Sequence, residues 1–319
     1  MRDYILRRMG LAVVTGLLIS VMIFAIMRLL PGDPLSILIG IDQDYVVFSD
    51  EERAKLLHDL GLDRPLAVQY FSWILNFARG EMGEALLRGE DVGQLILERA
   101  PITFEIGILA IIVSWLVGLP VGILSALRPN TWADTIARVV TVFFLAIPSF
   151  WFALLILITM TSVWQYHPPI YSVDIWDNPW SNVQIVIAPT IVLGLGLAAY
   201  LARISRSTML EVVGNDYVRT ARAKGLSERV VVIRHALRNA VLPVITVSGV
   251  QLGFILGGSV AVEYALGVPG IGSAMVTGAL ERDMNLVQNL VLVYGGVFIV
   301  VNLIVDLSYG FLDPRIRYE

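Results

Sequence analysis

The chain has 319 residues, of which 56% are hydrophobic and 16% charged, and its mean hydropathy is +0.74. Soluble domains carry about 25% charged residues, so this composition excludes an ordinary soluble fold and favours several membrane spans of roughly 20 residues each. The net charge is −4, lysine occurs only at Lys55 and Lys224, and cysteine is absent, which excludes a broad nucleic-acid-binding surface, disulfides and thiolate metal sites.

The first apolar segment covers residues 9–30 and follows three arginines, Arg2, Arg7 and Arg8. A secretory signal has the same order, but its apolar core is shorter and ends at a cleavage site of small residues. This segment runs instead into a Pro-Gly-Asp-Pro sequence. We therefore expect residues 1–30 to form a cytoplasmic N-terminus and a retained transmembrane helix.

Residues 31–100 are expected to form a small extracytoplasmic loop domain, in which 13 acidic residues stand against 6 basic ones. A helix is predicted at residues 49–60, capped by Ser49, and a second one at residues 65–78, closed by Gly80. The acidic surface is interpreted either as a solvated cap or as a docking surface for a partner protein.

Five further apolar segments have the length of a membrane span and are apolar around the whole helix circumference. They cover residues 104–127, 136–163, 183–202, 244–266 and 286–307. Because a bilayer span must satisfy its own backbone hydrogen bonds, we predict an all-α polytopic membrane protein with six transmembrane helices. Helices 2–6 would form the core of the protein, at residues 101–319.

Prolines and glycines inside these spans carry two further predictions. Pro120, Pro148 and Pro189 are expected to kink their helices without splitting them. The pairs Gly118/Gly122 and Gly253/Gly257 have the spacing of close helix packing rather than of a pore.

The distribution of basic residues predicts the orientation. Arginine and lysine concentrate before the first span, between the second and third spans, in residues 203–243 and in the C-terminal tail, whereas the short outer loops hold only Arg282. Because basic residues favour the cytoplasmic side and long loops are exempt from this rule, both termini are expected in the cytoplasm.

Several kinds of catalytic centre are missing. The sequence has no His-Glu-x-x-His zinc motif, and its three histidines, His58, His167 and His235, lie outside the spans. A Walker loop needs a lysine followed by serine or threonine, whereas Lys55 precedes leucine and Lys224 precedes glycine. We therefore expect no enzymatic activity and no cofactor in this chain, so that any ATP-driven work is powered by a different polypeptide.

Polar residues inside the spans offer few candidates for a permeation path. The carboxylates Glu105, Glu263 and Asp306 lie near span ends, where they are either interfacial or part of a gate. The candidate pathway or gate residues are Gln251, Ser259, Glu263 and Asn302.

The loop between the fourth and fifth spans, residues 203–243, is the most informative part of the chain. Asp216 is placed to cap a short helix, Gly225 to end it in the left-handed conformation, and Ser227 to cap a second helix that runs toward Asn239. The expected product is a helix-turn-helix elbow on the cytoplasmic face.

The first helix of this elbow has two interpretations. Arg219 and Arg222 share one of its faces, while Ala221 and Ala223 leave room for another surface to approach. The elbow is either a docking surface for a partner or a pair of amphipathic helices held on an anionic leaflet.

The sequence of this loop resembles the EAA loop of ABC importer permeases. The resemblance rests on Asp216-Tyr217-Val218-Arg219-Thr220-Ala221-Arg222-Ala223-Lys224-Gly225-Leu226, followed by His235-Ala236-Leu237-Arg238-Asn239 and Leu242-Pro243. It is closest to the dipeptide/oligopeptide/nickel permease family, in the subunit with the long first outer loop. Arg219-Thr220-Ala221 stands where the general pattern has Glu-Ala-Ala, which resembles the variant of this branch.

Further motifs extend the resemblance over nearly the whole chain. They are Pro31-Gly32-Asp33-Pro34, Leu60-Gly61-Leu62-Asp63-Arg64-Pro65, Glu263-Tyr264, Pro269-Gly270-Ile271-Gly272, Arg282-Asp283 and Asp313-Pro314-Arg315. Each string is weak alone, but their joint order is specific. Gly80-Glu81-Met82-Gly83 resembles a family Gly-Asp-Leu-Gly element, with Glu81 in place of aspartate.

The resemblance implies a type I ABC importer permease of the MetI-like fold in a prokaryotic cell (inner) membrane. It also implies a second homologous permease subunit, two ATP-binding cassette ATPase subunits that use ATP and Mg²⁺, and an extracytoplasmic substrate-binding protein. The ATPase-coupling residues that it implies are Asp216, Tyr217, Arg219, Ala221, Arg222, Ala223, Lys224, Gly225 and Leu226.

The substrate is the least determined expectation. The resemblance implies di- or oligopeptides, with nickel complexes, glutathione or oligosaccharides as alternatives. A more distant alternative is an ion-driven secondary carrier or channel, and another is a structural membrane scaffold.

Overall fold

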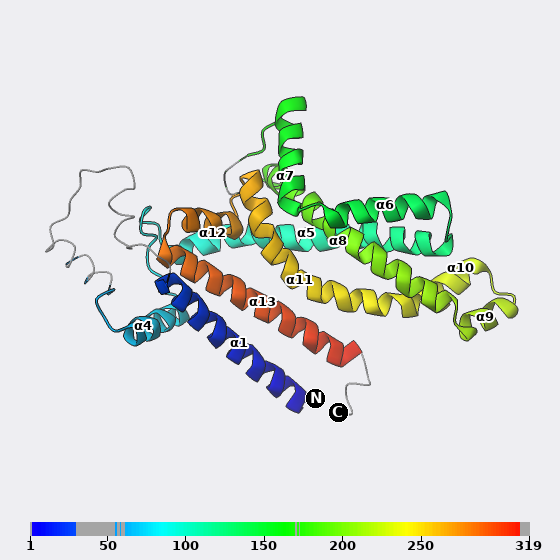
Figure 1. Ribbon diagram of the computed structural model, residues 1–319, viewed down its shortest axis with the longest axis horizontal. Coiled ribbons are helices and arrows are strands. Elements are labelled where there is room, and N and C mark those ends of the chain that lie inside the picture. The colour runs from blue at the N-terminus through cyan, green and yellow to red at the C-terminus, as the bar shows by residue number, and fades with distance from the viewer. Residues whose placement is uncertain are drawn as a thin grey trace. The chain divides into compact units, whose positions relative to one another are not determined.

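The computed structural model describes residues 2–29, 55, 58, 61–169, 171 and 173–312 (Figure 1). Three sequence predictions fall outside these residues in whole or in large part. They are the Pro31-Gly32-Asp33-Pro34 motif, the helix at residues 49–60 with its Ser49 cap, and the terminal Asp313-Pro314-Arg315.

Long apolar helices dominate the described residues, where the only β-type pairing is an isolated bridge between Glu84 and Asp91. Five helices are long and apolar enough to cross a membrane, or six if a bent pair counts as one span. These candidate spans correspond to α1 (Arg2–Leu29), α5 (Val92–Leu127), α8 (Pro179–Val213), α11 (Arg238–Leu266) and α13 (Met284–Leu312). The prediction of an all-α polytopic membrane protein is confirmed.

The bent pair lies at the predicted third span. Helix α6 (Trp132–Ala146) ends before Pro148, and α7 (Ser149–Ile158) continues at 98° to it through a short π-helix, η1 (Thr159–Val163). The prediction that Pro148 only kinks this span is therefore wrong. Ile147 is extended, with φ −78° and ψ 127°, because the proline ring disfavours a helical residue before it.

The two other prolines do not split their helices, as predicted, since Pro120 and Pro189 lie inside the continuous helices α5 and α8. Neighbouring helices compensate such prolines in membrane proteins. Sequence alone does not separate a proline that a helix tolerates from one that ends it.

The chain divides into two compact units, and the division runs through α5 and α13. One unit contains residues 1–101 and 270–303, and the other contains residues 102–269 and 304–319.

In the first unit, α1 and α13 lie side by side (Figure 1). An added Cβ at Gly16 would meet Ile299 at 3.6 Å, and one at Gly295 would meet Ile19 at 3.1 Å. The two helices are therefore in close contact around Gly16 and Gly295.

Helix α4 (Leu66–Arg79) packs against the end of α1, where the Tyr70 and Ser20 hydroxyl groups hydrogen-bond at 2.8 Å. Gly80 ends α4 in the left-handed conformation, with φ 82°, and its backbone N–H donates to carbonyl groups of the last helical turn. The prediction of a helix at residues 65–78 closed by Gly80 is confirmed.

The segment between α4 and α5 is fixed to the turn that joins α12 (Ile271–Leu280) to α13. The buried Asp283 carboxylate accepts hydrogen bonds from the backbone N–H of Leu86 at 2.6 Å and of Leu286 at 2.9 Å. Nearby, Arg88 donates to Glu281 at 2.6 Å, and this hydrogen bond raises the pKa of the Arg88 guanidinium. This turn therefore holds an otherwise irregular loop.

Replacing Asp283 by alanine is expected to loosen this loop, because the amides of Leu86 and Leu286 lose their acceptor. Each buried amide left unpaired costs roughly 1–3 kcal/mol. The matched control is Glu281→Gln, which weakens a partly exposed ion pair worth about 0–1 kcal/mol. Limited proteolysis of the purified complex should show faster cleavage near Leu86 in Asp283→Ala only, and equal cleavage in both variants would contradict the assignment.

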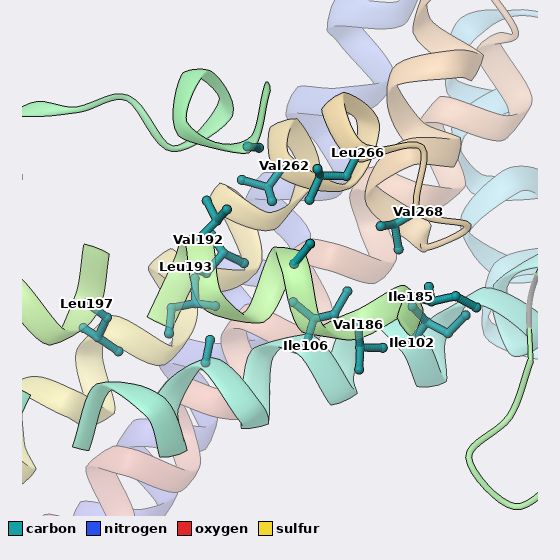
Figure 2. Packing of buried hydrophobic residues seen from close by; sticks show 14 of the residues in the cluster. Ile102, Ile106, Ile185, Val186, Val192, Leu193, Leu197, Val262, Leu266 and Val268 are labelled. Atoms are coloured by element: carbon teal, nitrogen blue, oxygen red, sulfur yellow. The ribbon is translucent and has the colours of Figure 1, made fainter. Parts of the chain in front are cut away.

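In the second unit, the core lies between α5, α8 and the end of α11 (Figure 2). Figure 2 shows Ile102 and Ile106 of α5 against Ile185 and Val186 of α8, with Val262 above them on α11. These branched side chains are buried, so that much of the apolar circumference of α8 is used for packing inside the chain.

In the C-terminal third of α5, the packing is closer still. An added Cβ at Gly118 would lie 2.4 Å from the Ala198 carbonyl oxygen, and one at Gly122 would lie 2.5 Å from the Ala202 carbonyl oxygen. The packing prediction is confirmed for this pair. At Gly257 no heavy atom of the described chain would lie within 4 Å of an added Cβ, so close packing there stays a prediction.

Candidate functional site

The elbow, defined here as residues 214–237, joins α8 to α11. Helix α8 ends at Val213, and α9 (Asp216–Ala223) follows after two residues. After a short turn the chain enters α10 (Glu228–Val230) and a π-helix, η2 (Val231–Leu237), which leads directly into α11. Figure 1 shows α9 and α10 together at one end of α8 and α11.

The start of α9 differs from the prediction by one residue. Asn215 takes the N-cap position in an extended conformation, and its side chain accepts no hydrogen bond from the first turn of α9. Asp216 is therefore the first helical residue rather than the cap. Its carboxylate still lies at the positive end of the helix dipole and pairs with Arg219 at 3.5 Å.

The end of α9 agrees with the prediction. Gly225 has φ +80°, and its N–H donates to the Arg222 carbonyl at 2.9 Å. The N–H of Leu226 then returns to the Ala221 carbonyl at 3.4 Å. Glycine is favoured here because it adopts positive φ without steric cost.

The second helix begins after Ser227, as predicted, although the Ser227 side chain accepts no hydrogen bond from the first helical turn. Its carbonyl accepts the N–H groups of Val230 and Val231 instead, at 2.9 and 3.0 Å. The helix does not stop near Asn239 but continues to Leu266, so a displacement of the elbow reaches the fifth predicted span through unbroken helix.

A small apolar core holds the elbow together. Val218 and Ala221 of α9 pack on Val231 of η2, and all three are buried. The Tyr217 hydroxyl accepts a hydrogen bond from the Asn239 amide at 2.8 Å. Sequence reasoning listed Ala221 as a coupling residue but missed the packing of Val218, although the two residues are three apart on one helix face.

An ion pair closes the turn of the elbow. Arg222 donates from Nη2 to Glu228 Oε1 at 2.7 Å and from Nε to Oε2 at 3.1 Å. This hydrogen bonding raises the pKa of the Arg222 guanidinium. Glu228 thus pairs with one of the two arginines that were predicted to share a face, whereas Arg219, which pairs with Asp216, keeps a side chain that is 77% exposed.

Arg222→Gln is expected to change stability by at most about 1 kcal/mol, because both partners of this pair are half-exposed. The matched variant is Val218→Ala, which deletes buried apolar groups worth roughly 1–2 kcal/mol. Thermal unfolding of the purified complex should therefore rank Val218→Ala below Arg222→Gln, and the reverse order would contradict the apolar seating of α9.

The remaining predicted coupling residues share one property, exposure at the end of the elbow. They are Asp216, Tyr217, Arg219, Ala223, Lys224, Gly225 and Leu226. The elbow therefore separates an inner face, which seats it on α8 and η2, from an outer face of mixed charge that is open to a partner.

The predicted pathway residues lie in different units. Gln251, Ser259 and Glu263 are on α11, whereas Asn302 is on α13. Ser259 and Glu263 are fully buried, and the Ser259 hydroxyl donates to the Leu256 carbonyl at 2.9 Å. Gln251 is half-buried.

Sequence reasoning missed a buried cluster at the turn between α5 and α6. Asp134 accepts two hydrogen bonds from Arg206 of α8, at 2.8 and 2.9 Å. A capping pattern, Thr131 followed three residues later by Asp134, was the available signal for the position of Asp134. No local pattern indicated its partner, 72 residues away. Within the described part of the chain, no three potential metal ligands come together.

Models of two protein families match the sequence. The model of binding-protein-dependent transport system inner membrane components matches residues 118–318. The model of the N-terminal part of binding-protein-dependent transport system membrane components matches residues 1–107.

Relatives that match along their full length are also transport system permease proteins. The chain is 36% identical over 319 residues to a putative peptide transport system permease protein of Brucella abortus. It is 36% identical over 342 residues to the dipeptide transport system permease protein DppB of Escherichia coli, and 38% identical over 340 residues to a di/tripeptide transport system permease protein of Pseudomonas aeruginosa. In each case 100% of both chains is covered.

Proposed function

The chain belongs to the family of binding-protein-dependent transport system inner membrane components, and we propose that it forms half of a peptide translocation path whose movement is driven through the elbow. It is a multi-pass permease subunit of an ABC importer of the bacterial inner membrane. It is not an enzyme, because ATP hydrolysis lies in separate subunits of such systems. A substrate-binding protein and ATPase subunits are its partners.

The observation that carries the proposal is the two-faced elbow. Its inner face is fixed by Val218, Ala221 and Val231, while its outer face presents Arg219, Lys224 and other exposed side chains. A rigidly seated helix with an open outer face suits docking into a groove on an ATPase subunit. The same fixation transfers a displacement of α9 to α8 and α11, which enter the predicted membrane region.

The proposed cycle follows from that connection. Two ATPase subunits bind ATP and Mg²⁺, close on each other and carry the docked α9 with them, so that the spans alternate between inward-facing and outward-facing states. Such coupling requires that the two states differ in docking contacts or in strain. The path itself would be completed by a second, homologous permease subunit.

The proposed substrates are di- or oligopeptides, because the relatives in Brucella, Escherichia and Pseudomonas carry peptide transport names. Along the proposed path, Gln251 is the best-placed candidate contact, since it is half-buried whereas Ser259 and Glu263 are fully buried in the chain. Asn302 is the corresponding candidate on α13.

The proposed orientation places both termini and the elbow in the cytoplasm, and residues 31–100 outside. This arrangement puts the elbow on the side where ATP is available. Since the chain has no cysteine of its own, single cysteines at exposed Arg219 and Glu81 can be compared in intact cells. An impermeant thiol reagent should label Glu81→Cys and spare Arg219→Cys, and labelling of Arg219→Cys would overturn the orientation.

The function is tested by purifying the tagged chain from its native membrane in mild detergent. We expect a second permease and an ATPase subunit in near-stoichiometric amounts, and uptake of labelled dipeptide after reconstitution with the binding protein. Retained uptake when the ion gradients are dissipated but ATP is present would support the importer. Uptake that needs the gradient instead, or a chain isolated without ATPase after cross-linking in membranes, would overturn it.

A further inference from the structure

The buried cluster at the α5–α6 turn joins three helices through one carboxylate. Asp134, which is fully buried, accepts from Arg206 Nε at Oδ1 and from Arg206 Nη2 at Oδ2. The Ser125 hydroxyl of α5 also hydrogen-bonds Asp134 Oδ1, and the Asn130 N–H donates to Oδ2 at 3.0 Å. Arg138 approaches the same oxygen at 3.5 Å.

The carboxylate also fixes its own turn. Thr131 caps α6 by accepting the Asp134 N–H at 3.3 Å, and its hydroxyl donates to the Arg128 carbonyl at 2.7 Å. Between them, Asn130 has φ 60°, in the left-handed region. The α5–α6 turn therefore presents the carboxylate to α8 in one defined orientation.

Arg206 lies on the helix that carries the elbow. Helix α8 continues without a break from Arg206 to Val213, and α9 begins at Asp216. One turn before Arg206 on α8, the close approach of Gly122 to Ala202 holds α5 against the same helix. A displacement of α9 therefore reaches the cluster through about two turns of α8.

A forked ion pair and apolar packing differ in what they fix. Two parallel N–H···O bonds define the angle between guanidinium and carboxylate, whereas apolar side chains of the same size permit sliding and rotation. Buried ion pairs are often no more stabilising than apolar replacements, so stability alone does not account for this one.

We propose that Asp134 and Arg206 form a positioning pair that makes the α5–α6 hairpin move with α8 when the ATPase displaces α9. The pair is part of the transmission between the ATPase and the translocation path, and its loss separates ATP hydrolysis from transport. This role rests on the proposed function of the elbow.

The experiment measures ATP hydrolysed per dipeptide transported, in the complete reconstituted complex with its binding protein. Arg206→Gln and Asp134→Asn are expected to raise this ratio by about 5-fold or more, the lower range of typical coupling effects. The double variant should be no worse than the worse single variant, because both remove the same interaction. Arg206→Lys, which keeps the charge but loses the fork, should fall between wild type and Arg206→Gln.

The matched control is Arg203→Gln. Arg203 is an exposed arginine on the same helix, in cation–π contact with Tyr200 at 5.4 Å and outside the cluster. Its substitution removes the same charge and should leave the ratio unchanged. A raised ratio in Arg203→Gln, or an unchanged ratio in the Asp134 and Arg206 variants, would overturn the proposal in favour of a surface-charge effect or a purely structural role.

A second double variant covers the case in which the single variants fail to assemble. Asp134→Leu with Arg206→Met removes both charges of the pair and keeps apolar volume, so assembly should return while the ratio stays raised. Wild-type coupling in this variant would show that packing suffices and overturn the proposal. A wild-type complex that hydrolyses ATP but moves no dipeptide would instead refute the proposed substrate, a distinguishable failure.

Discussion

Gly225→Val is expected to abolish substrate-stimulated ATP hydrolysis and transport while the chain still enters the membrane. Gly225 has φ +80°, and a β-branched residue is strained in that region by roughly 1–3 kcal/mol. Outside the immediate chain neighbours, no heavy atom of the described chain lies within 4 Å of an added Cβ, so the strain arises within the local backbone rather than from a clash with another element. Relief of the strain requires the turn after α9 to change direction. This change rotates the outer face of the elbow, which is proposed to dock on the ATPase subunit. The measurement is ATP hydrolysis by the purified complex with and without loaded binding protein.

Two other variants control this result. Gly225→Asn should retain much of the stimulation, because asparagine tolerates the left-handed conformation better than valine does. Gly214→Ala lies just before α9 at φ −76°, where alanine is accommodated, and should behave as wild type. Full stimulation in Gly225→Val, with the ATPase bound in normal amount, would show that the direction of this turn does not matter for coupling.

The contrast between Gly225 and Asp216 shows what a local pattern can predict. A glycine after a short helix predicted a positive φ, because few other residues adopt it, and the structure agrees. The sequence predicted Asp216 as the N-cap, whereas Asn215 takes this position in the structure. Both residue types favour the N-cap, and nothing in the local sequence distinguishes them. Boundaries that depend on a special backbone conformation are thus better determined than those that depend on a shared preference.

Pro148 and the Asp134–Arg206 pair mark the limits of such patterns. Hydropathy identified an apolar segment across residues 136–163, but it did not show that a 98° bend divides the segment into α6, which packs on α8, and α7, which packs on α8 and α11. The ion pair joins residues from separate helices, so only the tertiary fold brings them together. The spans and the elbow follow from periodicity and turn chemistry, whereas the connection between them follows from packing.

Gly122→Val is expected to have a large effect on stability, because α5 and α8 are in close contact there. Its Cβ would lie 2.5 Å from the Ala202 carbonyl oxygen and 2.6 Å from the Ser205 Cβ, so one helix must move. Overpacking a close contact costs typically about 1–3 kcal/mol and occasionally more. We expect a lower thermal midpoint of the purified complex and less chain in the membrane.

The control for this variant is Gly196→Val on α8, where no heavy atom of the described chain lies within 4 Å of an added Cβ. It adds the same side chain to the partner helix and should leave the midpoint unchanged. If both variants unfold at the wild-type temperature, the α5–α8 contact is not close in the assembled complex. If only Gly122→Val is destabilised, the helix that carries Arg206 and the elbow is held by direct backbone contact, as transmission of movement along α8 requires.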